Sequence, residues 1–324
     1  MVVHADARPG QDLSGEEAPL AEVNAVLRPT SAQDEDGLIA NLRDADVVLV
    51  SAAPMTRRVM EGLPRCRGVV RYGVGVDNVD LAAATDLGIV VAHVLDFCTE
   101  EVANHALLFL LAWAKKLLPL DRRLRDGVWR AAPAAEVPTV YGQTLGIVGL
   151  GQIGRSLAAK AQALRMEVIA CDPYAKERGR PPSVPLVTLE GVLRRSDYVS
   201  LNVPLTEETF HLIGERELAL MKPSSVLINT ARGAVVDEAA LVSALQQRQI
   251  AAAALDVFEV EPLPASSPLR ELDNVILTPH TAGISEKSAR KVRTEVGKAA
   301  ADLLAGRWPR YVANRGVEPR VPLR

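Results

Sequence analysis

The chain has 324 residues, of which 48% are hydrophobic and 24% charged, and its formal net charge of −3 gives no reason to expect a nucleic acid or an acidic membrane as partner. This length predicts two domains of ordinary size with ample core. The three cysteines, Cys66, Cys98 and Cys171, are widely spaced and odd in number, which indicates neither a disulfide framework nor a metal site. The first ten residues do not resemble a signal peptide, and the longest apolar run, Ala106–Ala114, is too short to span a bilayer. We therefore expect a soluble, cytoplasmic protein.

The first hundred residues alternate between apolar strands and short helical segments. Asp46–Ser51 is apolar almost throughout, which is typical of a strand buried on both faces. A glycine-rich loop, Tyr72–Asn78, follows a later strand. We predict strands at Met1–Ala5, Asp46–Ser51, Gly68–Arg71 and Ile89–Ala92, helical segments around Leu38–Leu42 and over Val59–Leu63, and a polar loop at Pro9–Gly15 before the segment Glu22–Leu27. These elements form a first α/β unit.

A long helix is predicted to begin near Thr99, whose side chain suits an N-cap, and to end at Pro119. Its apolar residues wrap almost completely around it, so we expect both faces to be covered. Two interpretations stay open: a helix buried within one subunit, and a helix that also packs on a second subunit. The following segment, Gly127–Pro138, is predicted to be a loop.

The stretch Leu145–Asp172 contains a strand, a glycine turn, an amphipathic helix and a second strand that ends in a carboxylate. Gly149, Gly151 and Gly154 have the GxGxxG spacing, which permits a tight turn, the approach of a diphosphate and close packing of helix on strand. The helix N-terminus would face the diphosphate with free N–H groups. Asp172 can accept hydrogen bonds from a ribose diol and would repel a 2′-phosphate, which favours NAD. A plain glycine turn, and a dinucleotide-binding domain without catalysis, are the alternatives.

The alternation of strands and helices continues after Asp172. Strands separated by helices predict a parallel sheet with ligands at the carboxyl ends of its strands. The last helix, about Ser285–Leu304, is expected to return to the first domain. The elements predicted between these points are helices at Leu189–Ser196, Glu215–Leu220 and Asp237–Gln247, and strands at Asp197–Val203, Ser225–Asn229, Ala252–Val257 and Asn274–Leu277.

Three polar residues follow the late strands, where a doubly wound sheet places its working groups. Arg232, in NTARG, offers a planar cation for a substrate carboxylate and for an adjacent carbonyl. His280, in TPH, can exchange a proton with a carbonyl oxygen, and Glu261, in FEVEP, can favour the protonated ring and fix its tautomer. Taken singly, each residue has a plain structural interpretation; their common position predicts a catalytic site. The other histidines, interpreted as structural or surface groups, are His4, His93, His105 and His211.

The motifs GLGQIG, CDPY, INTARGAVVDEAAL, ALDVFEVEP and ILTPHTAG, with RYGVGVDNVD near the start, resemble those of the D-isomer-specific 2-hydroxyacid dehydrogenases over nearly the whole chain. The resemblance implies two doubly wound parallel-sheet α/β domains. Residues 1–95 and 285–324 would form a flavodoxin-like substrate domain, and residues 96–284 an inserted Rossmann NAD-binding domain. It also implies a homodimer formed mainly by the NAD-binding domain, and hydride transfer between NAD(H) and a small D-2-hydroxy acid or 2-keto acid.

The resemblance assigns roles to individual residues. Arg232, Glu261 and His280 take the catalytic places. Asp256 would meet the nicotinamide carboxamide, and Cys98 occupies a cofactor-facing position where relatives often carry serine or asparagine. Backbone N–H groups of the loop Arg71, Gly73, Val74 and Gly75 would hold the substrate carboxylate. The other positions expected to contact the dinucleotide are Gly149, Gly151, Gln152, Ile153, Gly154, Asp172, Val203, Thr230, Ala231 and Gly283.

Two finer resemblances bear on function. RYGVGVDNVD, DFCTEEVA and CDPY look most like the branch named after C-terminal binding protein, whose animal members are NAD(H)-sensing corepressors. An NAD(H)-gated binding protein is therefore the rival of the enzyme. The chain also resembles 3-phosphoglycerate dehydrogenase, but Ala52 and Ala53 stand where some of those enzymes carry basic residues for the phosphate.

Overall fold

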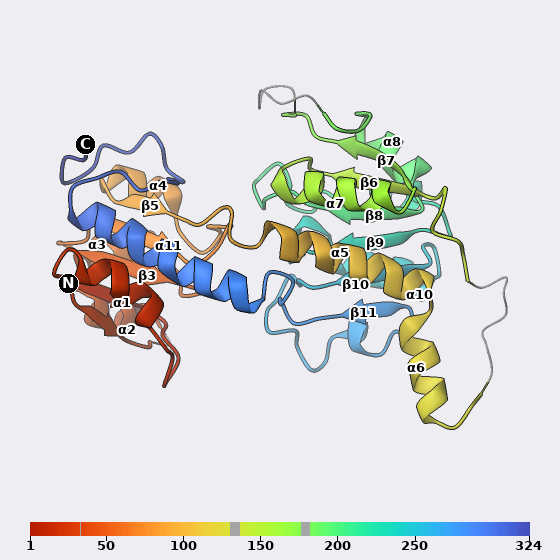
Figure 1. Ribbon diagram of the computed structural model, residues 1–324, viewed down its shortest axis with the longest axis horizontal. Coiled ribbons are helices and arrows are strands. Elements are labelled where there is room, and N and C mark those ends of the chain that lie inside the picture. The colour runs from red at the N-terminus through yellow and green to blue at the C-terminus, as the bar shows by residue number, and fades with distance from the viewer. Residues whose placement is uncertain (33, 130–136, 176–181) are drawn as a thin grey trace. The chain divides into compact units, whose positions relative to one another are not determined.

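The computed structural model describes residues 1–32, 34–129, 137–175 and 182–324, so most of the predicted loop Gly127–Pro138 lies outside the described residues. The chain divides into two compact units (Figure 1). The first unit is made of Met1–Cys98 and Ser285–Arg324, and the second of Thr99–Ile284. Each unit contains its own parallel sheet with helices, which confirms the predicted α/β fold class. Within the described residues, the helices are each too short or too polar to cross a bilayer.

The described part of the first unit has a sheet of five parallel strands. Its strands are β1 (Val2–His4), β2 (Leu27–Pro29), β3 (Val47–Val50), β4 (Gly68–Arg71) and β5 (Val90–Ala92). Their spatial order is β2-β1-β3-β4-β5, which is the flavodoxin-like order. Every residue of β3 is buried, as the continuous apolar run predicts for a central parallel strand.

Helices of the first unit come from both parts of the chain. They are α1 (Ser14–Ala21), α2 (Glu35–Leu42), α3 (Arg57–Glu61), α4 (Leu81–Asp86) and α11 (Glu286–Leu304). The predicted polar loop at Pro9–Gly15 is wrong at its end, because α1 begins at Ser14. α1 packs along α11 (Figure 1), and a Cβ on Gly297 would lie 2.6 Å from the carbonyl oxygen of Glu16. A contact this remote in sequence leaves no local signal.

The second unit has six parallel strands among its described residues. They are β6 (Thr144–Val148), β7 (Glu167–Cys171), β8 (Tyr198–Leu201), β9 (Val226–Asn229), β10 (Ala252–Leu255) and β11 (Val275–Leu277), in the spatial order β11-β10-β9-β8-β6-β7. A parallel bridge from Ala170 to Leu186 continues the sheet beyond β7. In this order β7 lies on one side of β6, and β8 with the later strands lies on the other, so the strand order reverses between β6 and β8. A Rossmann sheet binds a dinucleotide at this point.

Helices of the second unit are α5 (Thr99–Ala114), α6 (Leu117–Arg125), α7 (Gln152–Ala163), α8 (Leu189–Arg195), α9 (Glu215–Leu220) and α10 (Glu238–Gln246). The helix predicted to run from Thr99 to Pro119 is in fact two helices. Lys116 adopts a left-handed conformation (φ 54°) that ends the first, and Pro119 lies in the first turn of α6. Proline is tolerated in a first turn because its missing N–H has no helical partner there.

Candidate active site

The glycine turn between β6 and α7 has the conformation that its spacing predicts. Gly149 has a φ of +93°, and a Cβ on it would lie 2.5 Å from the carbonyl oxygen of Asn202. A Cβ on Gly154 would lie 2.2 Å from the carbonyl oxygen of Gly149. Gly151 is the N-cap of α7. The glycines are thus required for a left-handed turn and for close packing of the helix against the strand end.

Asp172 fixes this turn from the end of β7. Its carboxylate accepts hydrogen bonds from the N–H of Leu150 at 2.8 Å and from the N–H of Tyr174 at 2.9 Å, and the residue is 8% exposed. The acid predicted to recognise the ribose therefore lies directly beside the glycine turn. This is the arrangement in which a carboxylate can face the adenine ribose of a dinucleotide.

The ends of the neighbouring strands β8 and β9 carry buried polar atoms that a polar ligand could bind. The side-chain oxygens Thr230 Oγ1, after β9, and Asn202 Oδ1, after β8, are buried without a hydrogen-bond partner. A buried polar atom without a partner costs about 1–3 kcal/mol, so such atoms mark places where a bound group would complete the hydrogen bonding. Gln152 and Ile153 open α7, and Val203 lies beside Gly149. The residues at this edge thus suit the diphosphate and riboses of NAD.

His280 and Glu261 form a close imidazole–carboxylate pair. His280 Nδ1 lies 2.7 Å from Glu261 Oε2, and the N–H of Phe258 donates to Glu261 Oε1 at 3.0 Å. Burial by itself raises the pKa of Glu261, but the hydrogen bonds from His280 and Phe258 and the charges of His280 and Arg232 bring its pKa below the ordinary value. A carboxylate only accepts hydrogen bonds, so Nδ1 carries a proton and Nε2 is the nitrogen that can exchange one with a substrate.

Asp256 anchors the turn that presents His280. The N–H of His280, which has a φ of 53°, donates to the carbonyl oxygen of Asp256 at 2.7 Å. The Asp256 carboxylate accepts the N–H groups of Thr281 at 2.9 Å and Ala282 at 2.8 Å, and the residue is 1% exposed. Asp256 is therefore a structural anchor of the turn. Its contact with the nicotinamide carboxamide stays a prediction, and so does the contact of Gly283 with the dinucleotide.

Arg232 lies in a turn that packs against the loop carrying Glu261. Asn229 ties this turn together by donating to the carbonyl oxygen of Arg232 and accepting from the N–H of Ala231, at 2.8 and 3.0 Å. A Cβ on Gly233 would lie only 1.8 Å from the carbonyl carbon of Phe258. The backbones of the two turns are therefore in direct contact, and the structure brings the three predicted catalytic residues together.

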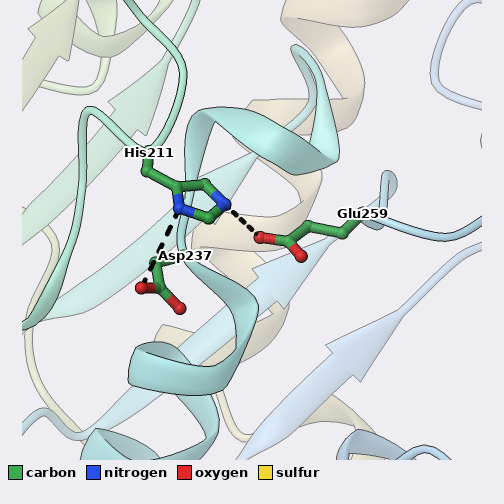
Figure 2. Close-up of side chains that lie close together, drawn as sticks. All are labelled: His211, Asp237 and Glu259. Carbon is green, nitrogen blue, oxygen red and sulfur yellow. Dashed lines mark hydrogen bonds and ion pairs between the residues drawn. The ribbon is translucent and has the colours of Figure 1, made fainter.

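A second imidazole–carboxylate pair lies in the same unit (Figure 2). His211 Nε2 is 2.6 Å from Glu259 Oε1, and His211 Nδ1 is 3.9 Å from Asp237 Oδ2. Three such ligand atoms within 4.8 Å of one another could hold a metal ion. However, a metal takes one ring nitrogen, and here the two nitrogens face different carboxylates. The arrangement is that of an imidazole bridging two loops, in line with the structural interpretation of His211.

The predicted carboxylate-binding loop, Arg71–Gly75, belongs to the first unit. Gly73 has a φ of +129°, which favours glycine, and its carbonyl oxygen accepts the N–H of Val94 at 3.0 Å. His93 Nδ1 donates to the carbonyl oxygen of Val74 at 2.8 Å. Burial lowers the pKa of His93, which favours the neutral ring in this role. Cys98, the last residue of this part of the unit, is buried.

Asp6 occupies a cluster of backbone donors at the end of β3. It accepts the N–H groups of Ser51 and Ala53 at 2.9 and 2.8 Å, and that of Ala52. Burial by itself raises the pKa of Asp6, but the hydrogen bonds from His4 and from these N–H groups lower its pKa to about 2. A negative charge thus already fills the donor cluster beside Ala52 and Ala53.

Asp6→Asn is expected to destabilise the protein at neutral pH and much less in acid. The folded pKa of about 2 lies below the ordinary 3.8, so the stabilisation is fully present above about pH 4 and is lost as the pH falls through the folded value. Because solvent screens this partly exposed carboxylate, we expect a difference of about 1–2 kcal/mol at pH 7. Urea denaturation of both proteins from pH 7 to pH 2.5 measures it; a difference that does not shrink below pH 4 would contradict the assignment.

Fold and site together define a class: a nicotinamide-dependent oxidoreductase. The sequence model of a protein family, "D-isomer specific 2-hydroxyacid dehydrogenase, NAD binding domain", matches residues 107–282. A glyoxylate reductase from Korarchaeum cryptofilum is 39% identical over 310 residues, which cover 94% of this chain and 90% of that protein. The structure of a D-lactate dehydrogenase from Aquifex aeolicus complexed with NAD and lactic acid has a TM-score of 0.85 and 30% identity, covering 94% of this chain and 96% of that one. The chain belongs to the D-isomer-specific 2-hydroxyacid dehydrogenase family.

A further relative has a different named activity. A D-3-phosphoglycerate dehydrogenase from Methanocaldococcus jannaschii is 39% identical over 306 residues, which are 94% of this chain but 57% of that protein. This chain therefore spans little more than half of that relative. None of the relatives named here singles out the branch of C-terminal binding protein, so that finer assignment stays a prediction.

Proposed function

We propose that the protein reduces a small 2-keto acid, or glyoxylate, to the 2-hydroxy acid with NADH, giving the D isomer where the product is chiral, and catalyses the reverse reaction. The bound nicotinamide supplies or accepts the hydride. His280 donates a proton from Nε2 to the carbonyl oxygen, and Arg232 binds the substrate carboxylate and polarises the carbonyl. The observation that carries the proposal is the 2.7 Å pair of His280 and Glu261, in the unit that matches the NAD-binding model and beside the turn of Arg232.

Glu261 has two effects on His280 in this proposal. Its hydrogen bond holds Nδ1 protonated, which leaves Nε2 as the exchanging nitrogen. Because the pKa of Glu261 is below its ordinary value, the carboxylate keeps its charge near neutral pH and stabilises the imidazolium that forms when the alcohol is oxidised. Residues 96–284 are the proposed NAD-binding domain, and residues 1–95 with 285–324 the proposed substrate domain, whose loop Arg71–Gly75 would receive the substrate carboxylate.

A substrate without a phosphate is favoured over 3-phosphoglycerate. The donors at Ser51, Ala52 and Ala53 already bind Asp6, so a phosphate there would meet a negative charge and occupied N–H groups. Two side chains at this position are methyl groups, which offer no charge to a phosphate. Glyoxylate, named for the Korarchaeum relative, is the first candidate.

The decisive experiment follows the absorbance of NADH with glyoxylate, pyruvate, hydroxypyruvate and 3-phosphohydroxypyruvate. We expect turnover of a small keto acid. The kcat/KM for the phosphorylated acid should be lower than this by a factor of about ten or more. Tight NADH binding without turnover of any acid would favour the rival, an NAD(H)-gated binding protein, which should then capture a protein partner in a cofactor-dependent way. Efficient use of the phosphorylated acid would favour the second alternative, 3-phosphoglycerate dehydrogenase.

Asp172→Asn is expected to weaken the preference for NADH over NADPH. The amide keeps an acceptor for the N–H of Leu150 but removes the charge that repels a 2′-phosphate. We expect the ratio of the two dissociation constants to change about tenfold, as for one charged hydrogen bond. Fluorescence titration with each dinucleotide measures the ratio, and an unchanged ratio would remove Asp172 from the ribose site.

We also propose a homodimer formed by the NAD-binding domain. α6 has no buried residue, and large apolar side chains around α5 and α6 are about half exposed or more. Burying such a patch against a second copy is favourable. The residues concerned are Leu108, Leu117, Leu118, Leu124 and Trp129. We also propose a cytoplasmic location, because three widely spaced cysteines do not suit the disulfide framework of a secreted protein.

Leu117→Asp combined with Leu124→Asp is expected to convert the dimer to a monomer, because two charges would be buried at the interface. Light scattering should give twice the 34.8 kDa chain mass for the wild type and the chain mass for the variant. Val26→Asp, at an exposed valine of the first unit, is the control and should stay dimeric. A monomeric wild type would reject the proposal.

A further inference from the structure

His105 connects helix α5 to the turn that presents His280. Its Nε2 lies 3.0 Å from Oγ1 of Thr278, two residues before His280. The imidazole stands edge-on to Phe109, one turn further along the helix, with 4.5 Å between ring centroids. The His105 side chain is 16% exposed and Phe109 is 2% exposed, so the ring is held against the core of the second unit. The packing of the ring against Phe109 thus fixes the position from which His105 contacts Thr278.

The chemistry of the groups fixes the direction of these hydrogen bonds. Thr278 has one hydroxyl proton and donates it to Asp256 Oδ1. The hydroxyl oxygen must then accept from His105, so Nε2 of His105 carries a proton. The chain of donors runs from the imidazole through the hydroxyl to the buried carboxylate. Neither oxygen nor nitrogen could be replaced by carbon without leaving a polar group unsatisfied.

This series of hydrogen bonds ends at Asp256, which supports the turn of His280. Its carboxylate holds the N–H groups of Thr281 and Ala282, and its carbonyl oxygen holds the N–H of His280. The residue is 1% exposed, and His105 Nε2 lies 3.8 Å from Asp256 Oδ1. A buried carboxylate needs partners on its oxygens to stay in one position. His105 therefore helps to fix the position of His280 through Asp256, without a contact of its own with the substrate.

We propose that His105 is a positioning residue for the proposed reaction: through Thr278 and Asp256 it holds the turn 278–282 in the conformation that presents His280. This inference rests on the proposed function for its kinetic consequence, whereas its structural consequence is independent of it. The competing explanation is that His105 fills space beside Phe109, in which case its bulk would matter and its N–H would not.

Two variants separate these explanations. His105→Leu keeps an apolar side chain of similar bulk beside Phe109 but removes the donor, and His105→Gln places an amide N–H near the position of Nε2. The first readout is hydrogen exchange of the backbone amides of Thr281 and Ala282, whose hydrogen bonds go to Asp256. The second is kcat and KM for the best keto acid of the panel, and the third is the dissociation constant of NADH.

With His105→Leu we expect about 10–100-fold faster exchange of these two amides and a kcat lower by a similar factor, with little change in KM. His105→Gln should restore both readouts to within about threefold of the wild type. Unchanged exchange in the leucine variant, or equal damage in the leucine and glutamine variants, would overturn the proposal. If the wild type turns over no acid, the proposed function fails, and the exchange rates still decide the role of His105.

Thr278→Val provides an independent test that does not alter α5. It removes the hydroxyl at nearly constant volume and should reproduce the faster exchange of Thr281 and Ala282. If His105 acts through Thr278, the double variant with His105→Leu should be no worse than the poorer single variant. If the effects of the two substitutions on the exchange rates are strictly additive, His105 does not act through the hydroxyl of Thr278.

Discussion

Replacing His280 by glutamine is expected to lower kcat about 10²–10⁴-fold, the range that a positioned acid–base contributes. Glutamine has no group that titrates near neutral pH, so it cannot deliver a proton to the carbonyl oxygen as the hydride arrives. The dissociation constant of NADH should change little, because His280 is predicted to act on the substrate. Steady-state kinetics with the best keto acid, and titration of NADH fluorescence, measure the two effects.

His211→Gln is a closely matched control for this experiment. Both histidines pair with a glutamate of the same loop, Glu259 or Glu261, at 2.6 and 2.7 Å, and both have a positive φ, of 49° and 53°. The two substitutions therefore remove similar contacts from similar backbones. We expect His211→Gln to keep kcat within about threefold, since exposed pairs contribute little. Equal losses in both variants would show that the pairs hold the loop and that His280 has no separate chemical role.

Local patterns in the sequence were sufficient to predict most of the elements that frame the site. Gly68–Arg71 and Glu215–Leu220 agree with β4 and α9 residue for residue. The glycine turn is similarly local, because a left-handed Gly149 and a close contact of Gly154 are encoded within a few residues. Where a structure depends on near neighbours alone, periodicity and turn chemistry are enough to predict it.

Contacts between distant segments were not accessible in the same way. The helix α1 is not predicted by the local sequence, because its partner α11 lies at the other end of the chain. The break between α5 and α6 at Lys116 is not predicted either, since a left-handed lysine has no distinctive sequence signal. From the sequence alone His105 is interpreted as a structural or surface group, and its contact with Thr278 appears only when α5 and the end of β11 are brought together. Two features of the sequence indicate that Arg232, Glu261 and His280 meet: their common position after late strands of one parallel sheet, and the motif order of the family.

Gly233→Ala is expected to be the most damaging single methyl group near the site. The added Cβ would lie 1.8 Å from the carbonyl carbon of Phe258, 2.0 Å from its oxygen and 2.4 Å from the nitrogen of Glu259. All three are backbone atoms, so no change of rotamer relieves the contact and the two turns must separate. Overpacking of this kind costs about 1–3 kcal/mol or more in the free energy of unfolding.

The same substitution should also lower kcat/KM about 100-fold, because a shift of about 1 Å between Arg232 and the His280–Glu261 pair is enough for such a loss. Urea denaturation and steady-state kinetics test the two parts. Gly316→Ala is the control: its added Cβ meets nothing within 4 Å, and both quantities should stay as in the wild type. If Gly233→Ala keeps full activity, the direct contact of the two turns is not what sets the distance between the arginine and the acid–base. If kcat/KM falls further than the smaller fraction of folded protein explains, the absence of a side chain at Gly233 is what keeps Arg232 at the correct distance from the acid–base.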